Sequence, residues 1–450
     1  MGVRKYFKLR KWQTNIRTEV IAGATIFMTM IYIVIVNPSI LSAAGMPFGP
    51  VMVATIMAAA VGCIACGLYA NRPFAMAPYM GENAFFAYTM VIAFGFAFKQ
   101  ALAGIFIAGI IFVIFTLSGL RKRLVTAIPP FLSASWAVAI GLFILFIGLA
   151  DAGISLPGIA TPVQVGDFTT VEILLVLFGT GVAGFLLVRK IKGALLVGIL
   201  VTLFVGLGLG VAGYGTALPR EIPSLTGAFP DWGEVFLKFD FTDIISTSMI
   251  SLIIVVFLMD FLDTMGTLIG LGSKAGFLDK RGRLPKIEKP MLVDASITAV
   301  GAIFGTSTTG AYIESATGIE SGGRTGLTAL TTGILFLAML LVTPFFAGLY
   351  NTAPGFLSLV VAPALIIVGV LMMAPIKMIN FDDLTQALPA VLTIAMMIFT
   401  FNIGFGLAAG IVVYPLVKVA AGRGKEVHPY AWGLFLVGVL LFVSYFHPWL

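Results

Sequence analysis

Long runs of apolar residues, separated by short polar stretches, follow one another along the whole chain. Most of them approach the roughly 20 residues that a helix needs to cross about 30 Å of hydrocarbon. They lack the strict alternation of apolar and polar positions that is typical of a membrane β-barrel. The pattern predicts membrane-spanning helices over residues 18–41, 51–69, 84–97, 101–118, 127–149, 171–188, 194–213, 244–272, 291–304, 312–320, 327–346, 356–374, 388–401 and 404–418, with a further apolar stretch at 430–446.

These ranges form two series of seven, and the order of the segments indicates a repeat. Because seven is odd, the second series must run across the membrane in the opposite direction to the first, as in inverted-topology repeats. We therefore expect a first repeat at 1–213, an external connector at 214–243 and a second repeat at 244–418. The apolar tail at 419–450 could cross the membrane again or lie at the interface.

Composition supports the membrane assignment and adds an orientation. Of the 450 residues, 59% are hydrophobic and 10% are charged, whereas about a quarter of a soluble domain is charged. The net charge of +7 comes from Lys and Arg in short loops that the scheme places on one side, Arg121–Arg123 among them. Lys99, Arg220 and Lys238 alone fall outside those loops. This bias predicts a cytoplasmic N-terminus and a multi-pass location in the cell's inner membrane.

The third segment of each series is interrupted and unusually polar. It reads FAMAPYMGENAFF at 74–86 and GTSTTGAYIESATG at 305–318. Irregular backbone at membrane depth is tolerated where it lines a cavity, and matched interruptions in two halves indicate a binding site near the midplane. We expect half-helices to begin near Ala84 and Ile313, with their N-terminal N–H groups facing that site.

The acids inside the apolar runs are few, and they cluster near these interruptions. Spacings of three and four place Asp260, Asp263 and Thr264 on one helix face. Each carboxylate costs about 2.5 kcal/mol or more at the bilayer centre, so a functional role is the first interpretation, and a cap or a tie between helices is the alternative. The candidate acids for proton coupling are Asp263, Glu314, Asp260, Asp294 and Glu82.

Several other functions are disfavoured by the same reading. The chain has no nucleotide-binding P-loop, and the G-x-G-x-x-G match at 208–213 lies inside a predicted span without a preceding strand. Cys63 and Cys66 lie in an apolar run, where thiols mainly pack. We find no nucleophile with a base and no continuous polar stripe, so the pattern predicts neither an enzyme nor a channel, and no cofactor, metal or nucleic acid. An anion exchanger stays open but is disfavoured by the acids.

Four motifs carry a resemblance to a known family. They are TIFMTMIYIVIVNPSIL at 25–41, MGxNAFF at 80–86, FLDTMGTLIG at 261–270 and ESATGIESGGRTGLT at 314–328. Together they resemble the azaguanine-type branch of the nucleobase:cation symporters, within the nucleobase/ascorbate transporter superfamily. The resemblance implies an all-α fold with a seven-plus-seven inverted repeat and short strands at segments 3 and 10. It further implies an elevator mechanism, in which a core domain of spans 1–4 and 8–11 moves against a gate domain of spans 5–7 and 12–14, and a homodimer.

The same resemblance implies a function and a site. It implies proton-coupled import of purine nucleobases, with guanine and hypoxanthine preferred and an adenine-preferring permease as the alternative. Asp263 and Glu314 match the two substrate-binding carboxylates, and Phe85 is expected to pack near the base. Glu82 is a departure, because many members carry an apolar residue there. The remaining expected substrate contacts are Asn83, Thr264, Ser315 and Thr309.

Overall fold

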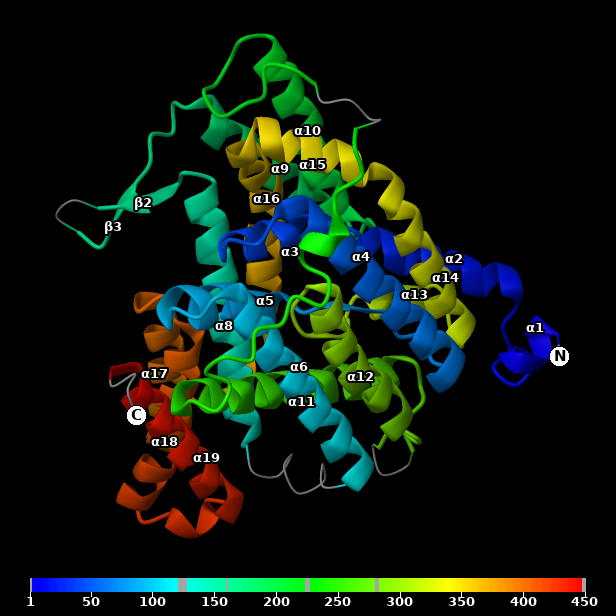
Figure 1. Ribbon diagram of the computed structural model, residues 1–450. Helices are drawn as coiled ribbons and strands as arrows, with labels where there is room; N and C mark the ends of the chain where they lie inside the picture. The colour runs from blue at the N-terminus through cyan, green and yellow to red at the C-terminus, as the bar shows by residue number, and fades with distance from the viewer. Residues whose placement is uncertain (1, 120–127, 159–160, 223–226, 280–282, 447–450) are drawn as a thin grey trace.

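The computed structural model describes residues 2–119, 128–158, 161–222, 227–279 and 283–446. Arg121–Arg123 and the first residue of the predicted span 127–149 lie outside these ranges. The described chain is mostly helical, and one small hairpin of β2 and β3 projects from the helices (Figure 1). Its strands, Ser155–Pro157 and Val163–Val165, are antiparallel.

The first half of the chain forms helices separated by tight turns. The bounds are α1 Val3–Tyr6, α2 Ile16–Met30, α3 Ile33–Ser42, α4 Phe48–Ala65, η1 Cys66–Ala70, α5 Met80–Ala84, η2 Phe85–Ala93, α6 Phe98–Ser118, α8 Pro130–Asp151, α9 Val171–Val188 and α10 Ala194–Val211. Of these, η1 and η2 are π-helical. The connector holds one 3₁₀ turn, η3 Trp232–Glu234.

The second half of the chain also forms helices separated by short turns. The bounds are α11 Thr247–Lys274, α12 Glu288–Phe304, α13 Ser315–Glu320, α14 Gly326–Ala338, η4 Met339–Val342, α15 Thr343–Thr352, α16 Pro354–Met372, η5 Ala374–Met378, α17 Leu384–Phe399, α18 Ile403–Ala420, η6 Gly424–Glu426 and α19 Pro429–Phe446. The helix α19 covers the stretch predicted at 430–446 and packs on α18 and α11.

Within the described residues, ten helical segments are long and apolar enough to cross a membrane. The predicted multi-pass, mostly helical architecture is therefore confirmed. Four predicted segments fall short of that length for identifiable reasons. The segments at 84–97 and 312–320 are broken into short pieces, whereas α12 and α17 have 17 and 16 residues. The count of fourteen spans stays a prediction.

Two short strands occupy the interrupted segments. Strand β1 (Met76–Pro78) pairs antiparallel with β4 (Thr309–Ala311), with Ala77 opposite Gly310. Each strand leads into a half-helix: α13 begins at Ser315, close to the expected Ile313, but α5 begins at Met80 rather than near Ala84. The Gly and polar residues of Met-Gly-Glu-Asn favour a loop in isolation, so the earlier start is decided by the tertiary structure.

The long helices pack mainly in two sets. In the first set, which comprises α2–α6 and α11–α14, α6 lies on α12 and α14 lies on α2 and α4. In the second set, which comprises α8–α10 and α16–α18, α8 lies on α16 and α17. Glycine permits a close approach of helices: a Cβ added at Gly141 of α8 would lie 2.8 Å from the carbonyl oxygen of Gly369 in α16. Such small-residue contacts are the usual basis of helix packing in membranes.

A buried carboxylate that the sequence analysis did not select fixes α14 within the first set. Glu19 of α2 is fully buried, and its Oε1 accepts a hydrogen bond of 3.0 Å from the backbone N–H of Arg324. Its Oε2 accepts bonds from the N–H of Thr325 and the hydroxyl of Thr328. An acid at a helix N-terminus satisfies donors that the helix itself leaves unpaired. Glu19 therefore has a structural role.

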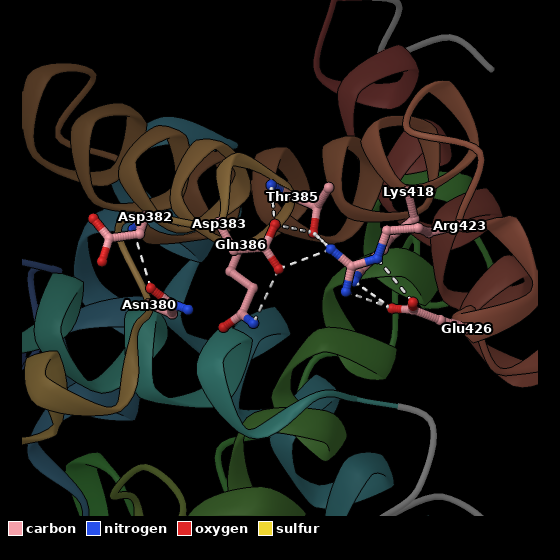
Figure 2. A network of polar contacts seen from close by, with 8 residues as sticks. All are labelled: Asn380, Asp382, Asp383, Thr385, Gln386, Lys418, Arg423 and Glu426. Atoms are coloured by element: carbon pink, nitrogen blue, oxygen red, sulfur yellow. Dashed lines mark hydrogen bonds and ion pairs between the residues drawn. The ribbon is translucent and has the colours of Figure 1, made fainter.

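A cluster of charges joins the start of α17 to the turn after α18 (Figure 2). Arg423 bonds Asp383 at 2.9 Å and Glu426 at 2.8 Å, and the buried Lys418 also bonds Glu426, at 2.6 Å. Hydrogen bonds from Thr385 and Arg423 hold the pKa of Asp383 below its usual range. Hydrogen bonds from Arg423 and Lys418 lower the pKa of Glu426 to about 2.

Replacing Arg423 with Ala is expected to lower the thermal unfolding midpoint at neutral pH, because both carboxylates lose their cation. A depressed carboxyl pKa contributes stability above the unfolded pKa, and this is lost as pH falls through the folded pKa. The difference in unfolding midpoint between Arg423→Ala and the parent protein should thus shrink as pH falls from about 4.5 to about 2. Lys425→Ala, which removes an exposed charge nearby, is the control. A difference that stays constant with pH would contradict this assignment.

Candidate functional site

A cavity of about 450 Å³ lies between the two helix sets at the paired strands, and we call it the main cavity because Asp263 and Glu314 both line it. The first set contributes Asp263 and Thr267 of α11, together with the residues that flank β1 and β4. The second set contributes Ala137 of α8 and an apolar wall from α16 and η5. A mostly apolar pocket with a few converging polar groups is typical of small-molecule sites.

Two carboxylates enter this cavity from different elements. Asp263 lies in the middle of α11, and Glu314 precedes the first residue of α13. The hydroxyl of Tyr32 donates a hydrogen bond of 3.0 Å to Oε1 of Glu314, which orients that carboxylate. Each carboxylate oxygen can accept more than one bond. Glu314 and Asp263 therefore keep acceptor capacity for donors on a ligand.

Two aromatic rings that the sequence analysis did not select also line the cavity. Tyr79 and Tyr312 lie with ring centroids 6.1 Å apart and planes within 8° of parallel. Each residue directly follows its strand, and the N–H of Tyr79 donates to Thr308 while that of Tyr312 donates to Ala75. Aligning the two interrupted segments would have found the pair, because each tyrosine stands one residue after the strand. Flat aromatic faces favour a flat ligand.

Asp260 and Asp294 lie in the first set, and neither is among the residues that line the described cavities. Oδ1 of Asp294 accepts a bond of 2.6 Å from the hydroxyl of Thr264, and Oδ2 accepts one of 2.7 Å from the N–H of Ala311. Oδ2 of Asp260 accepts a bond of 2.7 Å from Thr298. In this conformation Asp294 ties α11 and α12 to the strand β4, whereas Asp260 ties α11 to α12.

The predicted uncharged contacts also support the interrupted segments from outside the lining of the main cavity. The hydroxyl of Ser315 accepts a bond of 2.9 Å from the N–H of Ala75. The hydroxyl of Ser307 donates to Asn83, and that of Thr309 donates to the carbonyl of Ser307. Phe85 is fully buried at the start of η2. Their contact with a substrate stays a prediction.

A second cavity, of about 460 Å³, adjoins the first and shares Gly81 and Asp263 with it. It is lined by Glu82 of α5 and Trp136 of α8, and it reaches Pro130, the first residue of α8. Glu82 therefore lies on the lining that also contains Asp263. Of the five predicted acids, Asp263, Glu314 and Glu82 line these cavities in the described residues.

The described residues contain no group of three or more His, Cys, Asp or Glu side chains that could hold a metal ion. Cys63 instead packs beside β1, where its sulfur bonds the backbone of Met76. The cavity thus presents two carboxylates and two nearly parallel aromatic rings in its lining.

Gly310→Ala is expected to destabilise the interrupted segments. A Cβ at this position would lie 2.4 Å from the ring of Tyr79 and 2.6 Å from Oδ2 of Asp294. Overpacking of this kind typically costs about 1–3 kcal/mol. The thermal unfolding midpoint should fall relative to Gly208→Ala, a control in α10 where an added Cβ meets no atom within 4 Å. Equal midpoints would show that the strands tolerate the methyl group.

The chain is similar in sequence to known permeases. Residues 17–409 match the model of a family described as Permease family. The guanine/hypoxanthine permease PbuG of Bacillus subtilis (strain 168) is 39% identical over 98% of this chain and 99% of its own length. The adenine permease AdeP of Escherichia coli (strain K12) is 38% identical over 98% and 95%.

Solved structures share the architecture at low identity. The transmembrane domain of the cyanobacterium bicarbonate transporter BicA matches with a TM-score of 0.60 at 16% identity. The match covers 88% of this chain and 97% of that domain. This likeness concerns the fold alone.

Proposed function

The chain belongs to this permease family, the nucleobase/ascorbate transporter family, and from that premise we propose that it is a proton-coupled symporter importing purine nucleobases, guanine and hypoxanthine before adenine. Relatives in the family include permeases for guanine/hypoxanthine and for adenine. The protein is a transporter rather than an enzyme.

One observation carries the proposal: Asp263 and Glu314 enter the same cavity as the parallel rings of Tyr79 and Tyr312. A purine is a flat aromatic base with N–H donors on its edge. Aromatic faces pack on its plane, whereas carboxylates accept from its edge. A cavity of about 450 Å³ is within the usual range for small-molecule sites.

The orientation of the base follows from the charge of Glu314. Guanine presents N1–H and the 2-amino group side by side, and an ionised carboxylate accepts both. Adenine presents the N1 lone pair at that edge, which the carboxylate repels. We therefore expect excess guanine to inhibit labelled hypoxanthine uptake far more than equal adenine. Equal inhibition by the two bases would overturn this orientation.

Transport requires that the cavity open to either side in turn. We propose that the two helix sets correspond to a core domain and a gate domain that move as in an elevator, and that 1–213 and 244–418 form a seven-plus-seven inverted repeat. The antiparallel pairing of β1 with β4 supports a two-fold relation, because Met76 faces Ala311 just as Pro78 faces Thr309. We also propose that the protein lies in the inner membrane with its N-terminus in the cytoplasm. A homodimer stays a prediction.

Uptake of labelled hypoxanthine into proteoliposomes, with and without a pH gradient, tests the proposal. A gradient that is acid outside should drive accumulation, and a protonophore should abolish it. Uptake that equilibrates but never exceeds the external level would refute the proton coupling while leaving the base transport in place. No uptake of any purine base, by protein that is folded, would refute both.

Anion exchange is the second candidate, because the fold is shared with a bicarbonate transporter. The carboxylates of Asp263 and Glu314 oppose an anion in the cavity, and none of the residues lining it is Lys, Arg or His. Bicarbonate should therefore not compete with hypoxanthine.

A further inference from the structure

A third cavity, of about 210 Å³, lies at the other end of α8 from the second cavity. Pro130, the first residue of α8, lines the second cavity, and Asp151, the last, lines the third. The 22 residues of α8 make it about 33 Å long at 1.5 Å per residue. The main cavity lies between these two ends: Ala137 of α8, which lines it, is 14 residues from Asp151 along the helix, and Val368 of α16 is one turn from Leu365, which lines the third cavity.

Polar groups from both helix sets line this third cavity. The first set contributes Ser39 and Ser42 of α3 and Tyr88 of η2. The second set contributes Asp151 of α8 and Ser358 of α16. All five side chains are half-buried. The cavity thus lies where the two sets meet.

The polar groups offer hydrogen-bond acceptors more than donors. The hydroxyl of Ser39 donates to the carbonyl of Ile35 at 2.9 Å, and that of Ser42 donates to the carbonyl of Ser39 at 2.7 Å. Their hydrogens are therefore engaged within α3, and their lone pairs are left for the cavity. The carboxylate of Asp151 accepts no hydrogen bond and forms no ion pair with any residue that the structure describes.

The charge of this cavity is uncompensated. Asp151 is the last residue of α8, where the helix dipole places a further partial negative charge and where an acid is unfavourable. Asp151 and Tyr88 are the titratable groups among the lining residues, and no Lys, Arg or His is among them. A half-buried carboxylate between helices of a membrane protein is costly unless it is paired.

We propose that the third cavity binds a small monovalent cation, with Asp151 as the charged ligand and the hydroxyls of Ser39, Ser42 and Ser358 as neutral oxygen ligands. A single carboxylate with several neutral oxygens suits one positive charge, whereas divalent ions usually draw on more carboxylates. Sodium uses all of these oxygens, whereas a proton binds the carboxylate of Asp151, whose O–H then donates to one hydroxyl oxygen. Because the ligands come from both helix sets, an occupied site favours the arrangement of the two sets seen here over one in which they separate at this end.

The test uses the purified full chain in detergent. The thermal unfolding midpoint is measured at pH 8 while sodium chloride replaces choline chloride at constant ionic strength, and in choline chloride alone as pH is lowered to 5. A cation that binds the folded protein should raise the folded-to-unfolded ratio about 11-fold at ten times its Kd. A rise in the first arm identifies sodium, and a rise in the second identifies the proton.

Matched variants assign the effect to this cavity. Asp151→Asn should abolish the rise in unfolding midpoint. Asp167→Asn should keep it, because this variant removes an exposed acid in the connection between α8 and α9. Asp263→Asn should keep the response to sodium, so that failure of the proposed purine site is distinguishable from failure here. If Asp151→Asn yields no folded protein, Ser42→Ala and Ser358→Ala should shift the titration to higher cation concentration. No response in either arm, or an unchanged response in Asp151→Asn, would overturn the proposal.

Discussion

Glu314→Gln is expected to weaken the binding of guanine and hypoxanthine by about 1.5–3 kcal/mol, the range for a hydrogen bond to a charged group. This corresponds to a roughly 12- to 140-fold rise in Kd. The neutral amide keeps the size of the side chain but replaces one acceptor oxygen with a donor that faces the N–H groups of the base. Binding of labelled guanine to purified protein, by equilibrium dialysis or scintillation proximity, gives the value directly.

Two matched variants separate recognition from folding. Glu320→Gln changes an acid on the same half-helix, where Glu320 pairs with Lys274 at the surface, and should leave guanine affinity unchanged. Tyr32→Phe removes the hydroxyl that orients Glu314 but keeps the charge, and should cost less than Glu314→Gln. If Glu314→Gln binds guanine as tightly as the parent protein, another group recognises that edge of the base.

Asp263→Asn is expected to abolish uphill accumulation while allowing the exchange of base across the membrane. A carboxyl that loses its water when a base fills the cavity favours its neutral form. A protonated Asp263 can donate to a ring nitrogen that an anionic carboxylate would repel, so proton and base bind cooperatively. Asparagine keeps a donor but cannot titrate, so the coupling to the pH gradient should be lost.

The accumulation ratio measures this coupling. With one proton per base, a gradient of one pH unit supplies about 1.4 kcal/mol, so the parent protein should concentrate hypoxanthine about tenfold. Asp263→Asn should reach a ratio of about 1 but retain counterflow of labelled base. Asp382→Asn, an exposed acid near α17, is the control. If Asp263→Asn still concentrates hypoxanthine by pH alone, Glu82 is the next candidate because it lines the adjoining cavity.

The sequence by itself determined the class of protein and the position of the site. The length of the apolar runs requires helices in a membrane, because lipid leaves no other partner for most backbone groups. The polar interruptions at 74–86 and 305–318 predicted a cavity, because extended backbone at that depth needs one, and residues of both line the main cavity. The acids Asp263 and Glu314 followed from the cost of burying charge, and both line the main cavity.

The tertiary structure alone decided which acids face that cavity. Spacing along α11 places Asp260 and Asp263 on one face of the helix, but it does not reveal which of them points toward α12 and which toward α16. Packing against α12 gives Asp260 a bond from Thr298 and leaves Asp263 in the cavity. Likewise, Asp294 is committed to Thr264 and Ala311, a role set by the register of β4 rather than by its own neighbours in sequence.

Contacts between distant segments account for what the sequence did not predict. Tyr79 and Tyr312 come together when β1 pairs with β4, and Tyr32 joins the same cavity through its hydrogen bond to Glu314. Glu19 gains its role because α2 lies on α14, 305 residues away at the contact with Arg324. Asp151 ends an ordinary apolar helix, and its surroundings come from α3 and α16. These contacts join residues that are far apart in the sequence, so the local pattern of apolar and polar positions does not predict them.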